Sequence, residues 1–126
     1  MNYIIDSSAW VEYLKGSTGG KKVSEILKTN DEIYVIFPII SEVVSYIKRN
    51  KGNVETAYES IIKNAKIYEI TPRIAKETGI LHAEKKEKNE NFPMVDSLIV
   101  CCAKAIQAKI ITTDSHFKHF KEAIFI

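Results

Sequence analysis

Short apolar runs rich in β-branched residues alternate along the chain with longer segments whose apolar residues recur every three or four positions. The short runs predict buried strands, and the periodic segments predict helices. The expected strands are residues 3–5, 33–36, 67–70, 109–112 and 123–126. The expected helices are residues 7–14, 21–28, 39–48, 53–64, a segment that starts at Thr71-Pro72 and becomes strongly charged toward residue 90, and residues 94–103.

Strands that alternate with helices predict βαβ units, whose parallel strands all end at one edge of a sheet. The first strand ends at Asp6, directly before the helix that starts near Ser7-Ser8. In open α/β sheets, ligands bind at the edge where strands end and helices begin. Asp6 is therefore the first residue whose position needs a chemical explanation.

Composition narrows the class of protein. With 126 residues, 45% of them hydrophobic, the chain suits one domain, residues 1–126, with a continuous core. No apolar run approaches the roughly 20 residues of a membrane span, and the start lacks the layout of a signal peptide. The two cysteines, Cys101 and Cys102, are adjacent in an apolar helix, which is typical of buried thiols in a reducing compartment. We therefore expect a cytoplasmic protein.

Basic residues are lysine in sixteen cases and arginine in only two, with a formal net charge of +2. The sequence therefore does not indicate bidentate recognition of phosphate by arginine clusters. The charged run at residues 84–88 has two interpretations, a solvated helix end or a surface that faces RNA.

Three of the four aspartates, Asp6, Asp96 and Asp114, directly adjoin apolar runs that begin or end elements, whereas Asp31 resembles a turn residue. Each of the three, taken alone, could be a helix cap stabilised by the helix dipole. Glu42 is the fourth acid of interest, because it lies within an otherwise apolar helix. The βαβ pattern would bring these four carboxylates to one edge of the sheet.

Four neighbouring carboxylates repel one another unless a cation is bound, and we see no matching cluster of arginine or histidine in the sequence. Oxygen ligands suit Mg²⁺ or Mn²⁺ and not zinc. His116 and His119, three residues apart on an expected short helix, are a possible ligand pair, but other nitrogen or sulfur ligands for zinc are missing nearby. We expect His82, on the long charged helix, to be a surface or core residue.

The four acidic motifs, Ile-Ile-Asp-Ser-Ser, Ile-Ser-Glu-Val-Val, Val-Asp-Ser-Leu-Ile and Ile-Ile-Thr-Thr-Asp-Ser-His-Phe, resemble in order and spacing those of PIN domains, specifically VapC-like toxin ribonucleases. The resemblance implies an α/β fold, a three-layer α/β/α sandwich with a central, mostly parallel sheet of about five strands. It also implies a Mg²⁺- or Mn²⁺-dependent endoribonuclease that cleaves single-stranded RNA and is often inhibited by a cognate antitoxin. The implied metal and catalytic acids are Asp6, Glu42, Asp96 and Asp114, with Ser8 and Thr112 as supporting hydroxyls.

Two other functions stay open at this point. A phospho-acceptor receiver domain is also a small α/β fold with acids and Mg²⁺, although it requires an acidic pair after the first strand and a lysine near the last. A PIN-like module that binds RNA or protein without cleaving is the second alternative. We also expect a homodimer, as the family suggests, if the apolar face that carries Trp10, Tyr13 and Leu14 is exposed.

Overall fold

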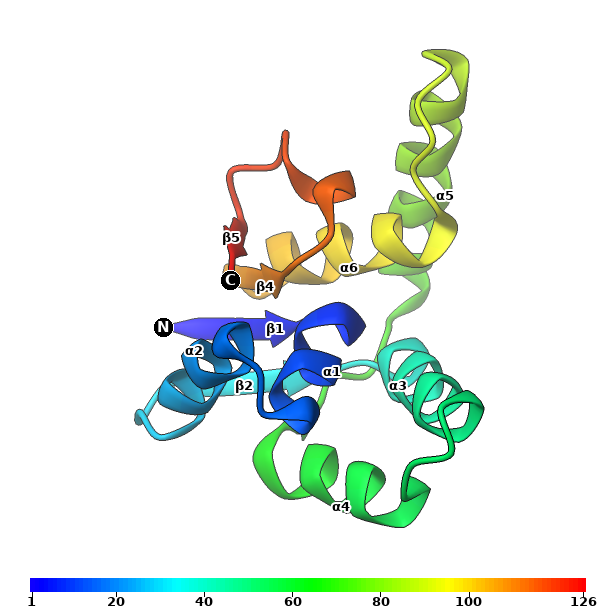
Figure 1. Ribbon diagram of the computed structural model, residues 1–126. Coiled ribbons are helices and arrows are strands. Elements are labelled where there is room, and N and C mark those ends of the chain that lie inside the picture. Colours follow the sequence, from blue (N-terminus) through cyan, green and yellow to red (C-terminus); the bar gives the residue numbers. More distant parts are fainter.

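The computed structural model describes residues 1–126, which form one five-stranded, all-parallel sheet and six α-helices (Figure 1). The strands are β1 Asn2–Ile5, β2 Glu32–Val35, β3 Lys66–Ile67, β4 Ala108–Thr112 and β5 Ala123–Phe125. The helices are α1 Ser7–Lys15, α2 Thr18–Leu27, α3 Phe37–Arg49, α4 Val54–Asn64, α5 Pro72–Glu87 and α6 Met94–Ala105, and a 3₁₀ turn, η1, covers Ser115–Phe117.

The strand order is β3-β2-β1-β4-β5, so the chain builds outward from β1 to β3 and then returns to the other side of β1 for β4. Right-handed crossovers place the helices of these two halves on opposite faces of the sheet. Figure 1 shows α3 and α4 on the side of β2 and α5 and α6 on the side of β4. The predicted α/β/α sandwich is confirmed, and the order differs from the 2-1-3-4-5 order of receiver-type folds. The receiver hypothesis is therefore wrong.

Local sequence explains where the helices begin and end. The side chains of Ser17, Asn53 and Thr71 accept hydrogen bonds from the first-turn N–H groups of α2, α4 and α5. Pro38 and Pro72 occupy the first turns of α3 and α5, where the missing proline N–H costs nothing. α1 ends at Gly16, whose φ of 70° is the left-handed conformation that glycine adopts without strain.

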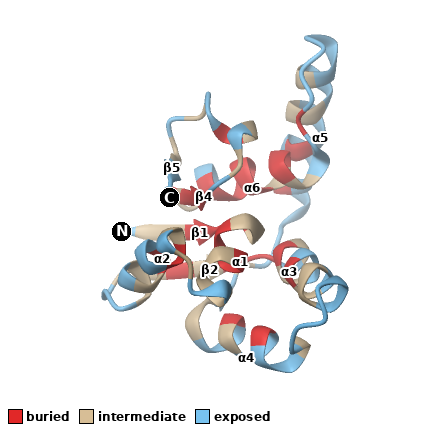
Figure 2. Ribbon diagram, viewed as in Figure 1, coloured by how far each residue is buried: buried red, intermediate tan, exposed pale blue.

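The core lies where α1 and α6 cover the central strands, and buried residues concentrate there in Figure 2. The Ile-Ile pairs at residues 4–5 and 110–111 are completely buried, as strands covered on both faces require. Trp10 is also completely buried, and Tyr13 and Leu14 are half-buried against the core. The condition on which this face would support a homodimer, exposure of its apolar residues, is therefore not met for Trp10.

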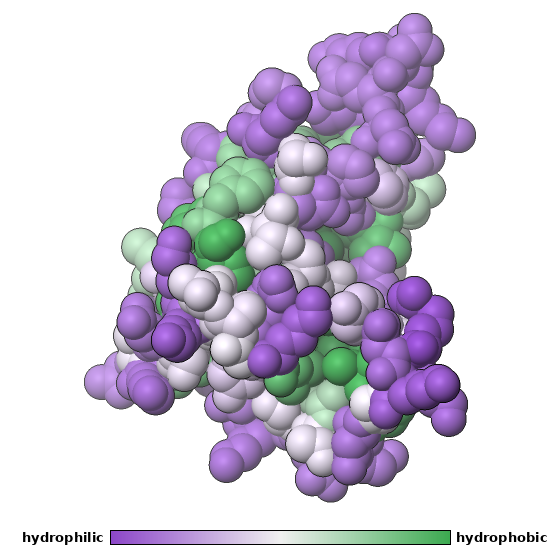
Figure 3. Space-filling view, in the orientation of Figure 1, coloured by the Kyte–Doolittle hydropathy of each residue, from purple (hydrophilic) through white to green (hydrophobic).

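Most boundaries differ from the sequence prediction by one or two residues, and two differ by three. The third strand covers Lys66–Ile67 and not residues 67–70, and its partner in the sheet, β2, ends at Val35. The second helix begins at Thr18, because Ser17 caps it and the pair Gly19-Gly20 continues it. The charged end of α5 projects from the body as a hydrophilic surface (Figures 1 and 3). No helix is long and apolar enough to cross a membrane.

Candidate metal centre

Asp6, Glu42, Asp96 and Asp114, from four different parts of the chain, line one cleft with a volume of about 630 Å³. The cleft lies at the edge where β1 and β4 end, between the two halves of the sheet. This is the switch point where the crossovers change direction and where ligands bind in open α/β folds. The prediction that these four side chains converge is confirmed as a matter of geometry.

Asp6 follows β1 and is only 4% exposed. It occupies the N-cap position of α1, yet its side chain does not cap the helix. The hydroxyls of Ser8 and Thr112 both donate to the same oxygen, Oδ2, each at 2.9 Å. Burial raises the pKa of Asp6, and these two hydrogen bonds oppose the rise. The carboxylate is therefore oriented by two hydroxyls and not used as a cap.

Thr112, at the end of β4, joins Asp6 to the next acid. Its Oγ1 accepts a hydrogen bond of 2.9 Å from the backbone N–H of Asp114, while it donates to Asp6. Ser8 similarly accepts from the N–H of Thr113 at 3.0 Å. The hydroxyls expected at residues 8 and 112 thus hold the loop after β4 against the start of α1.

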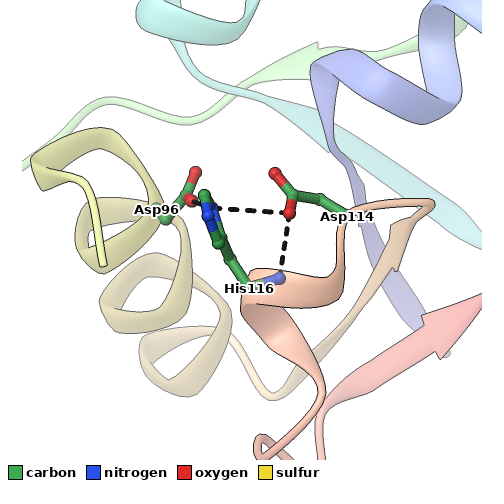
Figure 4. A group of neighbouring side chains, drawn as sticks. All are labelled: Asp96, Asp114 and His116. Atoms are coloured by element: carbon green, nitrogen blue, oxygen red, sulfur yellow. Dashed lines mark hydrogen bonds and ion pairs between the residues drawn. The ribbon is translucent and has the colours of Figure 1, made fainter. Parts of the chain in front are cut away.

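Asp96 and Asp114, which line the cleft, form a compact group with His116 (Figure 4). One oxygen of each aspartate and a ring nitrogen of the histidine all lie within 4.8 Å of one another. His116 Nδ1 is 2.9 Å from Asp96 Oδ2 and 3.4 Å from Asp114 Oδ1. Burial is the main cause that raises the pKa of Asp96 to about 6, and the bond to His116 opposes this rise.

The aspartates differ in whether they cap a helix. Asp114 accepts from the N–H of His116 at 2.9 Å and is the N-cap of η1, so the capping interpretation is correct for this residue. Asp96 lies in the first turn of α6, but Pro93 holds the cap position and the Asp96 side chain turns to His116. Asp96 therefore contributes its charge near the helix dipole without capping the helix.

Glu42 reaches the cleft from the exposed side of α3. Its pKa is raised, first by partial loss of solvent in the cleft and then by the charge of Asp6, with Asp96 and Asp114 adding to the effect. The carboxylates of the cleft therefore repel one another, as expected from the sequence.

Sequence reasoning did not identify His116 as a neighbour of Asp96. His116 belongs to the acidic site, whereas His119 is exposed and lies beyond η1, so the two do not form a ligand pair. The sequence shows no cluster of arginine or histidine that matches the four acids, but the fold brings single cations to them: Arg49 and Lys15 also line the cleft. Asp114, two residues before His116, caps η1. This cap is the sequence signal from which the position of His116 near Asp96 could have been predicted.

The donor set fits a hard divalent cation. Carboxylate oxygens dominate it, and one imidazole nitrogen is the only other ligand atom in the group of Asp96, Asp114 and His116. Burial and the charges of neighbouring aspartates raise the pKa of Glu42 and of Asp96. Such oxygen-rich sets favour Mg²⁺ or Mn²⁺. Asp96 and Asp114 are the residues best placed to bind the ion, with Asp6 and Glu42 in the same cleft.

Solved structures of similar fold include three that contain VapC proteins. The first is the VapBC2 complex of Rickettsia felis bound to a DNA fragment from its promoter. The match spans 100% of this chain and 98% of the other chain, with 19% identity and a TM-score of 0.79. VapBC-1 of nontypeable Haemophilus influenzae gives 19% identity and a TM-score of 0.74 over 100% and 97% of the two chains. VapC20 of Mycobacterium tuberculosis, a toxin that cleaves the sarcin-ricin loop, gives 12% and 0.73 over 92% of each chain.

These likenesses concern the fold, because the identities are low. No curated protein sequence matches the chain. The PIN domain family matches residues 3–123, which include all four acids of the cleft and both supporting hydroxyls. The chain therefore belongs to the PIN domain family.

Proposed function

We propose that this protein is a metal-dependent endoribonuclease that cleaves single-stranded RNA and acts as the toxin of a toxin-antitoxin pair. The observation that carries the proposal is the convergence of four carboxylates in one open cleft at the switch point of the sheet. Such a cluster costs stability without a cation, so a ligand that supplies positive charge explains why the fold contains it.

In this proposal Asp6, Glu42, Asp96 and Asp114 hold Mg²⁺ or Mn²⁺. When bound, the ion would supply the positive charge that lowers the pKa of a water and stabilises the charge that develops on the phosphate. Ser8 and Thr112 keep the carboxylate of Asp6 in one orientation, through the two hydrogen bonds to Oδ2. His116 does the same for Asp96 through its contact with Oδ2.

A side-chain nucleophile is not needed in this chemistry. The hydroxyls of Ser8 and Thr112 are already engaged with Asp6 and with the backbone N–H groups of Thr113 and Asp114, and neither has the histidine base of a serine hydrolase. We therefore assign the attack on phosphorus to water and the positioning to the protein.

The experiment is cleavage of a labelled single-stranded RNA by the purified chain with Mg²⁺, with Mn²⁺ and with EDTA. We expect products only with a divalent ion, and no products from the Asp6→Asn variant. Asp31→Asn is the matched control, because Asp31 pairs with the amino terminus of Met1 and lies outside the cleft. Full cleavage in EDTA would refute the metal-dependent mechanism.

The same preparation addresses the other function and the partners. RNA binding without product under every metal condition would favour the non-cleaving PIN-like module. The structural neighbours that are VapBC complexes support a protein antitoxin as the inhibitor. A homodimer is also part of the proposal, and a monomer by light scattering at high micromolar concentration would contradict it.

A further inference from the structure

Two helices, α1 and α3, form part of the wall of the cleft, and each presents one face to it. On α1 the face comprises Ser8, Glu12 and Lys15, and on α3 it comprises Glu42, Ser45, Tyr46 and Arg49. Residues spaced by three, four and seven positions lie on one side of a helix. Both walls therefore carry an acid or its supporting hydroxyl at one end and a cation two turns further along.

The cationic end is built around one aromatic ring. The ammonium of Lys15 lies 5.6 Å from the ring centroid of Tyr46, and the guanidinium carbon of Arg49 lies 5.9 Å from it. These distances are within the range of cation–π attraction. The half-buried Tyr46 ring thus brings together two positive charges that come from different helices.

Arg49 has no carboxylate partner, and Lys15 has only a long contact with one. Arg49 forms no ion pair, and its Nε donates only to Ser45 Oγ at 3.3 Å. Lys15 is 3.8 Å from Glu12 Oε2, at the outer limit of an ion pair. The chain's other arginine, Arg73, instead donates to Glu77 at 3.1 Å. Arg49 and Lys15 are therefore available to an anion that enters the cleft.

We infer that Lys15 and Arg49, held by Tyr46, bind a backbone phosphate of the RNA strand on one side of the cleavage position. This inference rests on the proposed function. Seven helical residues separate Glu42 from Arg49, a rise of about 10.5 Å at 1.5 Å per residue. At the roughly 3.4 Å per nucleotide of one strand of a DNA duplex, that rise spans about three nucleotides.

The Lys15–Arg49 subsite would offset the repulsion between the RNA backbone and the four acids. The four acids repel a polyanion, whereas a phosphate that sits between Lys15 and Arg49 gains two attractive contacts next to them. The strand would then lie along the cleft with one phosphate at the cations and another at the acids. The pair therefore acts on substrate position and not on the chemical step.

The test compares Arg49→Gln and Lys15→Gln with the control Arg73→Gln, which removes the paired arginine on α5. Binding of a fluorescent single-stranded RNA is measured in EDTA over a range of salt concentrations. We expect Arg49→Gln to weaken binding about ten-fold, the size of one hydrogen-bonded charge contact. The slope of log affinity against log salt should fall by about 0.7 for each lost phosphate contact.

Kinetics with Mg²⁺ separates substrate position from chemistry. Arg49→Gln should raise KM for the longer RNA about ten-fold with little change in kcat, and it should leave cleavage of a dinucleotide, which is too short to reach the cations, unchanged. Wild-type affinity and salt slope in both cleft variants would overturn the inference, as would an equal loss in Arg73→Gln. Arg49-dependent binding by a wild-type chain that never cleaves RNA would refute the proposed function while supporting this subsite.

Discussion

Replacing Asp96 by asparagine tests whether the cleft stores electrostatic strain. The side chain is 12% exposed, and its pKa rises from 3.8 to about 6 in the folded, metal-free chain. A rise of about two pKa units corresponds to about 3 kcal/mol that the ionised carboxylate costs the folded state. Asparagine has the same shape, can still accept from His116 Nδ1, and carries no charge.

The net gain is smaller than this upper value. Asp96 lies in the first turn of α6, where a negative charge is worth about 0.3–1 kcal/mol to the helix. We therefore expect the metal-free Asp96→Asn variant to be about 2 kcal/mol more stable than wild type at pH 8. For a chain of this length that corresponds to a Tm higher by roughly 6–10 °C.

The sign of the pH dependence follows from the raised pKa. Below about pH 3.8 the carboxyl is protonated in both the folded and the unfolded state, so it costs nothing. Between pH 3.8 and about 6 the folded chain holds the proton more tightly, so wild-type stability falls as pH rises. The advantage of the variant should therefore be small near pH 4 and complete above pH 7.

The assay is urea unfolding of wild type and Asp96→Asn in EDTA from pH 4 to pH 8, with Asp31→Asn as the control. The amino terminus lowers the pKa of Asp31, so this control should not stabilise the protein. Added Mg²⁺ should raise the Tm of wild type by mass action and that of Asp96→Asn much less. A variant that is no more stable than wild type at pH 8, or a difference that is independent of pH, would refute the reasoning.

Two further predictions concern residues that build the cleft and its walls. Thr112→Val removes the donor to Asp6 and the acceptor for the Asp114 N–H while it keeps the shape of a completely buried side chain. The free energy of unfolding, measured with urea at pH 7, should fall by about 1–3 kcal/mol, and an unchanged midpoint would contradict this prediction. Gly20→Ala places a Cβ against the carbonyl oxygen of Glu12 where α2 crosses α1, and it should lower the Tm clearly, whereas Gly79→Ala, with open space around it, should not.

Most of the fold was predictable because its strongest signals are local. The Ile-Ile pairs in β1 and β4 are apolar on both faces, and only a strand covered by helices on both sides buries them. The cap residues Asn53 and Thr71 likewise mark the starts of α4 and α5. Each of these elements is specified by its own residues.

The third strand shows where such local reasoning fails. Residues 67–70 have the alternation of a strand, but β2 offers partners only as far as Val35, whose carbonyl accepts the last bond, from the Tyr68 N–H, at 2.9 Å. α3 begins two residues later, so residues beyond Tyr68 have no neighbouring strand to pair with. The length of β3 depends on its partner, which a pattern within one segment does not contain.

The candidate site contains residues whose positions follow from local sequence and residues whose positions depend on distant parts of the chain. Asp114 has a local reason to exist, the cap of η1, and it also lines the cleft, so capping and site chemistry are not alternatives for this residue. Asp6 holds a cap position but gives its oxygen to two hydroxyls, and one of them comes from a strand 106 residues away. A carboxylate that is 4% exposed, has its pKa raised by burial and faces other acids is unfavourable for folding alone. Local rules that are broken at one place in an otherwise consistent fold indicate a ligand site, and the acids found there support the cation that we propose.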